Sequence, residues 1–314
     1  MKEKISVLMS VYNAEKYLQT CINSVLNQSY SNFLFYIVND CSTDNSLAII
    51  NSYNDNRIRL INNERNIGLT KSLNKALDYI NTEYVARIDA DDICEPNRLK
   101  YQLSIFENQD ENLALVGASA YEIDEKGNLI GEINVENTNL KEKLFFKNTF
   151  VHSSVMLRTT VLKEFRFDES IKYAQDYSLW VKIAQKYNVK NCGAKLIRYR
   201  IHRESISVLK KKEQDLCVLP TINYQLKKIG IKNDVKRAKL AKLHFQYFNL
   251  EKKEFKFKDR FRIFLYFKNI LKVNKHNKIY NDYFNQKLIG IINKEKGILF
   301  KCLKRFILVK VGFR

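Results

Sequence analysis

The sequence lacks any long uncharged apolar run. No window holds the roughly 18 apolar residues that a membrane-spanning helix needs. The apolar stretch that follows Met1, residues 5–12, has the length of a strand and does not fit a signal peptide. We therefore expect a cytoplasmic protein that is not integral to a membrane.

The chain is also poor in the patterns that build disulfide frames, zinc fingers and glycine-rich phosphate loops. Its six cysteines are scattered without a CxxC pair, which favours a reducing compartment. The first polar turn, SVYNAEKY at 10–17, contains no glycine. Sugar nucleotidyltransferases typically carry a glycine-rich phosphate loop near the N-terminus, so this class of nucleotide enzyme matches poorly.

The excess positive charge is confined to the last third of the chain. Residues 1–207 contain 26 basic and 26 acidic residues. Residues 208–314 contain 28 basic and 8 acidic residues, so they carry the whole net charge of +20. This change of composition predicts a domain boundary between residues 207 and 208.

The first 110 residues alternate between strand-like apolar runs and helical periodicity. This pattern predicts βαβ units with parallel strands, whose ligands bind beyond the carboxyl ends of the strands. The expected strands are 5–12, 33–38, 57–62 and 83–88, and the expected helices are 14–28, 47–54, 69–80 and 97–108. Further along we expect a hairpin at 113–133, strands at 151–158 and 195–202, and a helix at 176–187.

Four acids are crowded into RIDADDICEPNRL, residues 87–99, directly after an expected strand. Asp-x-Asp at a strand end suits Mg²⁺ or Mn²⁺, which take further ligands from water and substrate phosphates. Such a site indicates a nucleotide diphosphate as substrate. The alternative is that these acids cap the next helix and face solvent. Polar clusters at 10–13 and 39–44 also follow strands, and their convergence on one crevice favours the metal site.

Three other side chains are candidates for chemistry. Asp40 ends the second strand and can accept a hydrogen bond from a nucleotide base, whereas Ser42 and Asp44 fit a helix cap. Asp176 opens a helix, where it is either a cap or a general base for an acceptor hydroxyl. His202 ends a strand and is either structural or one ligand of a Mn²⁺ shell.

Six segments within residues 5–207 resemble the family 2 glycosyltransferases in order and spacing. They are ISVLMSVYNAEKYLQTCINSVLNQSY, VNDCSTDNS, NERNIGLTKSLNKAL, YVARIDADDICEPNRL, AQDYSLWVKIA and YRIHRESIS. The resemblance implies the GT-A fold, an α/β fold with a Rossmann-like mixed sheet flanked by helices. It also implies inverting transfer from a nucleotide-sugar, for which we expect a UDP-sugar. The nucleotide half would be about 1–110 and the acceptor half about 111–207.

The resemblance also implies roles for the matching positions. Asp176 would be the catalytic base. The nucleotide would be bordered by Ser10, Val11, Tyr12, Asn13, Asp40 and Asp89. Mn²⁺ or Mg²⁺ would be bound by Asp91 and His202, with Asp89 as a further candidate ligand. The donor or acceptor would be contacted by Asp92, His152, Ser153 and Trp180.

Several positions depart from the pattern of the family. Cys41 stands where glycine is common, Ser10 replaces a frequent proline, and Gln175 stands where the pair is usually Glu-Asp. HSS at 152–154 replaces an expected His-Gly-Ser. None of these changes removes a charged catalytic atom, so we expect activity, with the identities of donor and acceptor left open.

The basic last third lies outside the resemblance and is expected to be mainly helical. In GILFKCLKRFILVKVGFR, residues 297–314, apolar and basic side chains can occupy opposite faces of a helix, as in helices that lie on anionic membranes. The alternative is a soluble helical tail with a solvated basic face. A nucleic-acid-binding protein is the alternative function class, but no nucleic-acid module is recognisable and the first 207 residues are neutral.

The resemblance, taken with the basic last third, implies a metal-dependent glycosyltransferase that is peripheral at the inner face of the cell membrane. Its acceptor would be a glycan or lipid-linked glycan of a lipo-oligosaccharide, O-antigen or capsule. We expect no nucleic-acid partner, and the sequence leaves the oligomeric state open.

Overall fold

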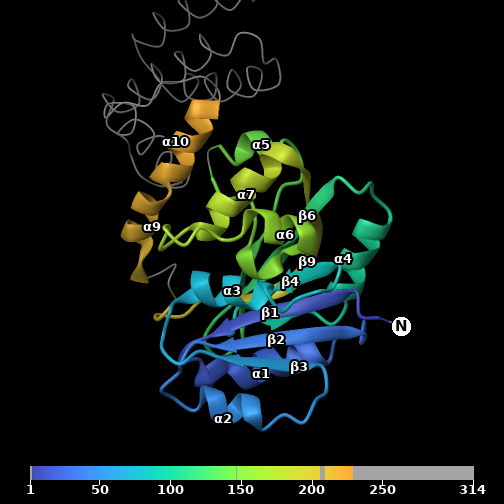
Figure 1. The fold of residues 1–314 in the computed structure, drawn as a ribbon, viewed down its shortest axis with the longest axis vertical. Coiled ribbons are helices and arrows are strands. Elements are labelled where there is room, and N and C mark those ends of the chain that lie inside the picture. The colour runs from blue at the N-terminus through green and yellow to red at the C-terminus, as the bar shows by residue number, and fades with distance from the viewer. Residues whose placement is uncertain (1, 146, 206–208, 229–314) are drawn as a thin grey trace, which may run out of the picture. The chain divides into compact units, whose positions relative to one another are not determined.

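The computed structural model describes residues 2–145, 147–205 and 209–228 (Figure 1). The chain divides into two compact units, one of residues 1–144 with 148–218 and one of residues 145–147 with 219–314. In the second unit the described helix is α10, Leu219–Lys228. The amphipathic basic segment predicted at 297–314 lies outside the described residues. Within the described part of the chain, no helix has both the length and the apolar character to cross a membrane.

The first unit is built on a mixed sheet whose strand order is β3-β2-β1-β4-β8-β6-β9-β5, with β7 paired to β6. The strands are β1 Ile5–Val11, β2 Phe33–Asn39, β3 Ile58–Asn62, β4 Tyr84–Arg87, β5 Ile93–Cys94, β6 Leu113–Ile123, β7 Leu129–Ile133, β8 Met156–Arg158 and β9 Asn188–Arg200. The first four are parallel, as predicted. The sheet becomes mixed because β8 runs antiparallel to both β4 and β6.

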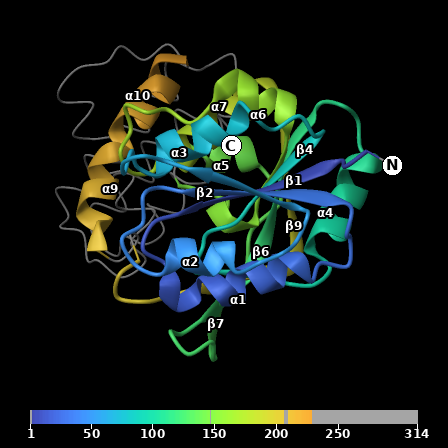
Figure 2. The same cartoon turned by 60° about the horizontal axis from the view of Figure 1, so that its bottom comes forward.

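Helices cover both faces of this sheet. They are α1 Glu15–Leu26, α2 Ser46–Asn51, α3 Leu69–Leu77, α4 Arg98–Glu107, α5 Leu140–Lys143, the 3₁₀ helix η1 His152–Ser154, α6 Thr159–Phe165, α7 Gln175–Lys186 and α9 Lys211–Cys217. Figure 2 shows α1 and α2 on one face of β1 and β2 and α3 on the other. The helical spacing of Leu18, Cys21, Ile22 and Val25 explains the position of α1, since all four side chains are fully buried against the sheet.

Helix α1 begins after Ala14, and the preceding Asn13 has a left-handed backbone, with φ at 50°, and accepts a hydrogen bond from Thr43 N on its side-chain oxygen. The alternative that the acids of 87–99 cap the next helix is wrong for Asp92 and Glu95, because α4 begins after Asn97. Both acids are held instead by β9, the last strand of the unit, as described below.

Two strand boundaries also differ from the prediction. The segment 151–158 starts as η1, because Ser154 closes a turn by donating hydrogen bonds from its N–H and its hydroxyl to Val151 O at 2.9 and 2.8 Å. Only Met156–Arg158 is a strand. Strand β9 starts at Asn188, seven residues before the predicted start, because its whole length pairs with β6 in parallel.

Candidate active site

The carboxyl ends of the parallel strands form one continuous edge. Asp40 N donates to Val11 O at 2.8 Å, and Asn63 N donates to Asn39 O at 2.9 Å. The register places β4 directly beside β1 at the same level. The three polar clusters that the sequence places after β1, β2 and β4 therefore converge on one edge, as predicted.

Asp40 is buried at the end of β2, with its carboxylate tied to the turn before α3. Its Oδ1 accepts from Asn63 Nδ2 at 2.8 Å and from Ile67 N at 2.9 Å, and its Oδ2 accepts from Gly68 N at 2.8 Å. These bonds use three of about four acceptor positions of a carboxylate, so Oδ2 can accept one more donor. A nucleotide base N–H is a donor of the required kind.

The turn after β1 presents the predicted nucleotide-binding residues in different ways. Val11 is buried and Ser10 is half-buried, whereas Tyr12 is 51% exposed. Asn13 fixes the turn to the cluster after β2 through its 2.8 Å bond from Thr43 N. The backbone of this turn and the ring of Tyr12 are therefore the parts available to a ligand.

Cys41 adopts the conformation that explains why glycine is common at its position in the family. Its φ is 59°, in the left-handed region that favours glycine. Its thiol lies 3.6 Å from Glu64 O, next to the loop that binds Asp40. The cysteine thus keeps the turn geometry of a glycine at a cost in backbone strain.

Each of the four acids in 87–99 has a partner within the chain, three of them from β9 or the residues just after it. The pairs are Asp89 with Arg87, Asp91 with His202, Asp92 with the backbone N–H of Arg200, and Glu95 with Arg198. Charge crowding in this segment is therefore relieved by basic and N–H groups on a strand more than 100 positions away.

Asp89 is fixed by two neighbours. Its carboxylate forms an ion pair with the buried Arg87, and it accepts a hydrogen bond from Ser153 Oγ at 2.8 Å. Ser153 Oγ in turn accepts from Asp89 N at 3.0 Å. Burial by itself raises the pKa of Asp89, but Arg87 and the hydrogen bond from Ser153 lower it by more, so the net pKa is below its usual value. Asp89 is therefore held as a carboxylate.

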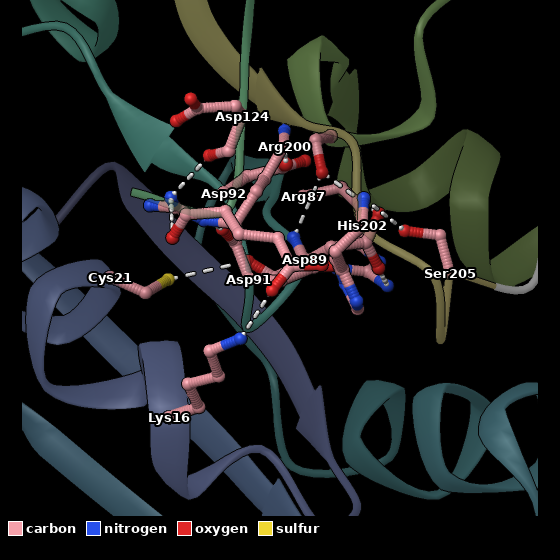
Figure 3. Close-up of polar contacts among 12 residues, drawn as sticks. Lys16, Cys21, Arg87, Asp89, Asp91, Asp92, Asp124, Arg200, His202 and Ser205 are labelled. Carbon is pink, nitrogen blue, oxygen red and sulfur yellow. Dashed lines mark hydrogen bonds and ion pairs between the residues drawn. The ribbon is translucent and has the colours of Figure 1, made fainter. Parts of the chain in front are cut away.

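Asp91 and His202, the two predicted metal ligands, contact each other directly (Figure 3). His202 Nε2 lies 2.9 Å from Asp91 Oδ2. The side chain of Asp91 is 30% exposed and that of His202 is 11% exposed, so both reach the surface of the crevice. The ring of Tyr17, from α1, lies 5.1 Å from the imidazole and limits its movement.

Asp92, the residue that follows Asp91, is buried, with 1% of its surface exposed. Its Oδ1 accepts from Arg200 N at 2.8 Å, and its Oδ2 has no hydrogen-bond partner among the described residues. Burial, and next the charges of Asp91 and Asp89, raise the pKa of Asp92 well above its ordinary value. The protonated form is therefore favoured here.

Two protein ligands at an open surface fit a hard divalent cation. The described residues contain no group of three or more His, Cys, Asp or Glu side chains placed to bind one ion. Mg²⁺ and Mn²⁺ in nucleotide enzymes are commonly bound by one or two protein side chains and complete their shell with phosphates and water. Asp91 and His202, both acceptors when the imidazole is neutral, are such a pair.

Asp176 lies in the first turn of α7 and is half-buried. It is not the helix cap, which is Ala174, a residue with a left-handed φ of 59°. Asn148 Nδ2 donates to Asp176 Oδ2 at 2.8 Å. The charge of Asp176 also acts on His152, whose pKa is lowered by burial and by Arg87 and is partly restored by Asp89 and Asp176. His152 therefore links the carboxylates of the two halves of the site.

Three of the four predicted donor or acceptor contacts have almost no exposed surface. Trp180 and Ser153 are fully buried, and Asp92 is nearly so. The indole of Trp180 packs 6.1 Å from the ring of His152 and so supports that side chain from behind. In this conformation these three residues shape the site, and only the half-buried His152 can reach a ligand.

Sequence reasoning missed three residues that build the site: Arg87, Arg200 and Asn148. Arg200 N donates to Asp92 Oδ1, and Arg200 Nε donates to the backbone oxygen of Asp91, both at 2.8 Å. The guanidinium carbon of Arg200 lies 4.5 Å from the ring centre of Tyr17. The two-residue spacing between Arg200 and His202 could have indicated that both side chains reach the site, because alternate residues of a strand lie on the same face. Arg87 precedes Asp89 by two residues in the same way. No local pattern indicated Asn148.

A groove of about 620 Å³ lies beside α3, away from the four acids. Its lining includes Lys71, Lys75, Arg166 and Phe167. The ring of Phe167 lies 5.9 Å from that of His152, so one wall of the groove adjoins the back of the site.

Known proteins match this chain over the same region. The family model for glycosyl transferase family 2 matches residues 6–166. An uncharacterized glycosyltransferase of Methanocaldococcus jannaschii is 39% identical over 224 residues, which are 68% of this chain and 77% of the relative. The Escherichia coli protein WfgD, a UDP-Glc:alpha-D-GlcNAc-diphosphoundecaprenol beta-1,3-glucosyltransferase, is 32% identical over 211 residues, covering 67% of this chain and 81% of WfgD.

The fold agrees with solved structures. S. aureus TarS, crystallised with UDP, aligns with a TM-score of 0.58 over 87% of this chain and 81% of that one, at 19% identity. This likeness supports the GT-A architecture predicted from the resemblance. The family model spans half of the chain, and the Methanocaldococcus relative is similar over two-thirds of it. The chain therefore belongs to glycosyl transferase family 2 and is a glycosyltransferase of GT-A fold.

Proposed function

We propose that this glycosyltransferase is metal-dependent and inverting, and that it transfers a sugar from a UDP-sugar to a hydroxyl of a growing bacterial surface glycan. The observation that carries the proposal is the arrangement around His152. Asp89, next to the pair Asp91 and His202, and Asp176 both lie near enough to His152 for their charges to raise its pKa, and Asp176 has a carboxylate oxygen available. Donor and acceptor groups can therefore meet between these two carboxylates.

The nucleotide would lie along the ends of β1 and β2. Asp40, which is 1% exposed, would shape the base subsite through the turn at Ile67 and Gly68 that it holds; Tyr12 would offer its exposed ring, and Asp89 would accept from the ribose. Asp91 and His202 would hold Mn²⁺ or Mg²⁺. The bound ion would neutralise the charge that develops on the departing nucleoside diphosphate.

The transfer step is assigned to Asp176. Its free carboxylate oxygen accepts the proton of the acceptor hydroxyl, while the hydroxyl oxygen forms the new bond to the anomeric carbon. The bond from the anomeric carbon to the diphosphate breaks in line, and its electron pair leaves with UDP. A single in-line displacement inverts the anomeric centre. The surrounding aromatic residues, Phe167 and Trp180, exclude water from the side of His152.

Two similarities support the donor and acceptor classes. TarS is known from crystals with UDP, and WfgD is named for transfer from UDP-Glc to a sugar on diphosphoundecaprenol. A lipid-linked diphosphate acceptor lies at a membrane surface. The basic region 208–314, which we propose as a second domain beside the catalytic region 1–207, supplies the charge to hold the enzyme at the inner face of that membrane.

The donor can be identified by measuring thermal stabilisation of the full chain by a panel of nucleotide-sugars with Mn²⁺, followed by product formation. Asp176→Asn is expected to retain donor binding and to lose turnover by about 10²–10⁴-fold. The control is Asp168→Asn, because Asp168 pairs with Lys182 of the same helix at 3.0 Å without lying at the site. Near-normal turnover in Asp176→Asn would refute the assignment of the base.

The membrane assignment has a separate test. The full chain is expected to bind anionic vesicles in low salt and to release them as salt rises, and to bind neutral vesicles weakly. DNA at the same salt concentrations is the comparison. Tight binding to DNA together with no binding to anionic vesicles would overturn the assignment.

A further inference from the structure

Asn148 makes the direct hydrogen bond to the proposed catalytic base. Its Nδ2 donates to Asp176 Oδ2 at 2.8 Å, although the two residues lie 28 positions apart. Its Oδ1 accepts from Phe150 N at 3.1 Å. Since the amide oxygen is used by a backbone donor, the NH₂ group is the side that faces the carboxylate.

The rest of the surroundings leaves one oxygen of Asp176 available. Oδ1 of Asp176 has no hydrogen-bond partner among the described residues. The other neighbouring groups act without such a bond: the N-terminal turn of α7 favours a negative charge, and His152 on η1 lies near enough for the charge of Asp176 to raise its pKa. Asn148 therefore decides which oxygen points away from the protein and toward an acceptor.

We propose that Asn148 is a positioning residue that holds Asp176 in the rotamer required for proton abstraction. This inference rests on the proposed role of Asp176 as the base. The hydrogen bond from Asn148 fixes the orientation of the base, and small misplacements of reacting groups cost on the order of 10²-fold in rate. Asn148 would therefore act on the reaction through Asp176.

The test compares Asn148→Ala and Asn148→Asp with the wild-type full chain, using kcat, donor KM and melting temperature. Asn148→Ala is expected to lower kcat about 10- to 100-fold with donor KM unchanged. Asn148→Asp is close in size to asparagine and should keep the packing and the melting temperature. It replaces the amide donor with a carboxylate oxygen, so its kcat should fall by at least as much while donor KM stays unchanged.

A double-variant cycle separates positioning from simple loss of structure. If Asn148 acts through Asp176, then adding Asn148→Ala to Asp176→Asn removes little further activity. Asn108→Ala, which changes an exposed amide at the end of α4, is the matched control and should leave kcat and donor KM unchanged.

Three results would overturn the inference: unchanged kcat in Asn148→Ala, wild-type kcat in Asn148→Asp, or full additivity in the cycle. These outcomes are distinct from failure of the proposed function. Failure of the base assignment shows as activity in Asp176→Asn. Failure of the positioning role shows as an inactive Asp176→Asn beside a normal Asn148→Ala.

Discussion

The imidazole Nε2 of His202 lies 2.9 Å from Oδ2 of Asp91, although 111 positions separate the two residues. The contact exists because β5, directly after Asp91 and Asp92, pairs with β9, directly before His202. Cys94 is opposite Ile197 and Ile93 is opposite Arg198 in that ladder. A short two-residue strand thus brings the last strand of the unit to the acids that follow β4.

Removing either member of this pair should weaken metal-dependent nucleotide binding. We expect Asp91→Ala and His202→Ala each to raise the dissociation constant for UDP in Mn²⁺ at least tenfold, or about 1.4 kcal/mol. Titration calorimetry with and without Mn²⁺ measures this. Asp110→Ala, a change of an exposed acid between α4 and β6, is the control. Wild-type affinity in both site variants would show that the ion is bound elsewhere.

Arg200 connects the acidic segment 89–92 with the residues just after β6 and with Tyr17 of α1. Besides its contacts to Asp91 and Asp92, its Nη1 donates to Asp124 O at 2.9 Å, and it is 4% exposed. A guanidinium reaches several carbonyls in fixed directions, which an ammonium cannot do. Arg198, two residues earlier on the same strand, makes an exposed ion pair with Glu95 instead.

This contrast gives a matched pair of substitutions on β9. Arg200→Lys should destabilise the fold by about 1–3 kcal/mol, since buried carbonyls lose charged donors. Arg198→Lys should change stability by less than about 1 kcal/mol, as exposed ion pairs do. Urea unfolding of both variants measures the difference. Equal effects at the two positions would show that Arg200 does not hold the acidic segment 89–92.

The sequence predicted the parallel half of the sheet because β1, β2 and β4 are continuous apolar runs, each followed by polar residues. The same pattern indicated Asp40, Asp89 and Asp91, since carboxyl ends of parallel strands share one edge. These are local signals: periodicity and the residues after a strand. The pairing of Asp91 with His202 agreed with the family resemblance, which supplied order and spacing that local patterns lack.

What the sequence could not show depends on contacts between distant segments. Asn148 lies in no periodic element, and its role appears only when α7 is placed beside it. Trp180 was predicted to contact a ligand, but helical periodicity gives a buried face without saying what lies against it. The early start of β9 has the same origin, since its first residues become a strand by pairing with β6.

Cys41 offers a test of backbone strain at the edge formed by the carboxyl ends of the parallel strands. Its φ of 59° is unfavourable for a residue with a Cβ, so Cys41→Gly should stabilise the fold by about 0.5–1 kcal/mol after the added freedom of the unfolded chain is counted. Cys217→Gly, in helix α9, should destabilise by up to about 1 kcal/mol. Thermal and urea unfolding compare them. A destabilising Cys41→Gly would mean that thiol contacts outweigh the strain.

His152 should make stability depend on pH. Burial, and next the charge of Arg87, lower its pKa below the ordinary value of 6.5, and Nε2 has no hydrogen-bond partner among the described residues. Between the folded and unfolded pKa values the unfolded chain binds more protons than the folded chain. Stability therefore rises with pH through this window and is lost as pH falls below 6.5.

Replacing His152 with glutamine removes this titration and keeps a polar side chain in the same space. Between pH 7.5 and pH 5.5, values taken about one unit either side of the ordinary histidine pKa, wild type should lose more unfolding free energy than His152→Gln. Urea unfolding at matched ionic strength gives the difference. If the two proteins lose the same free energy, the pKa of His152 is not lowered by folding, and burial beside Arg87 does not hold its imidazole neutral.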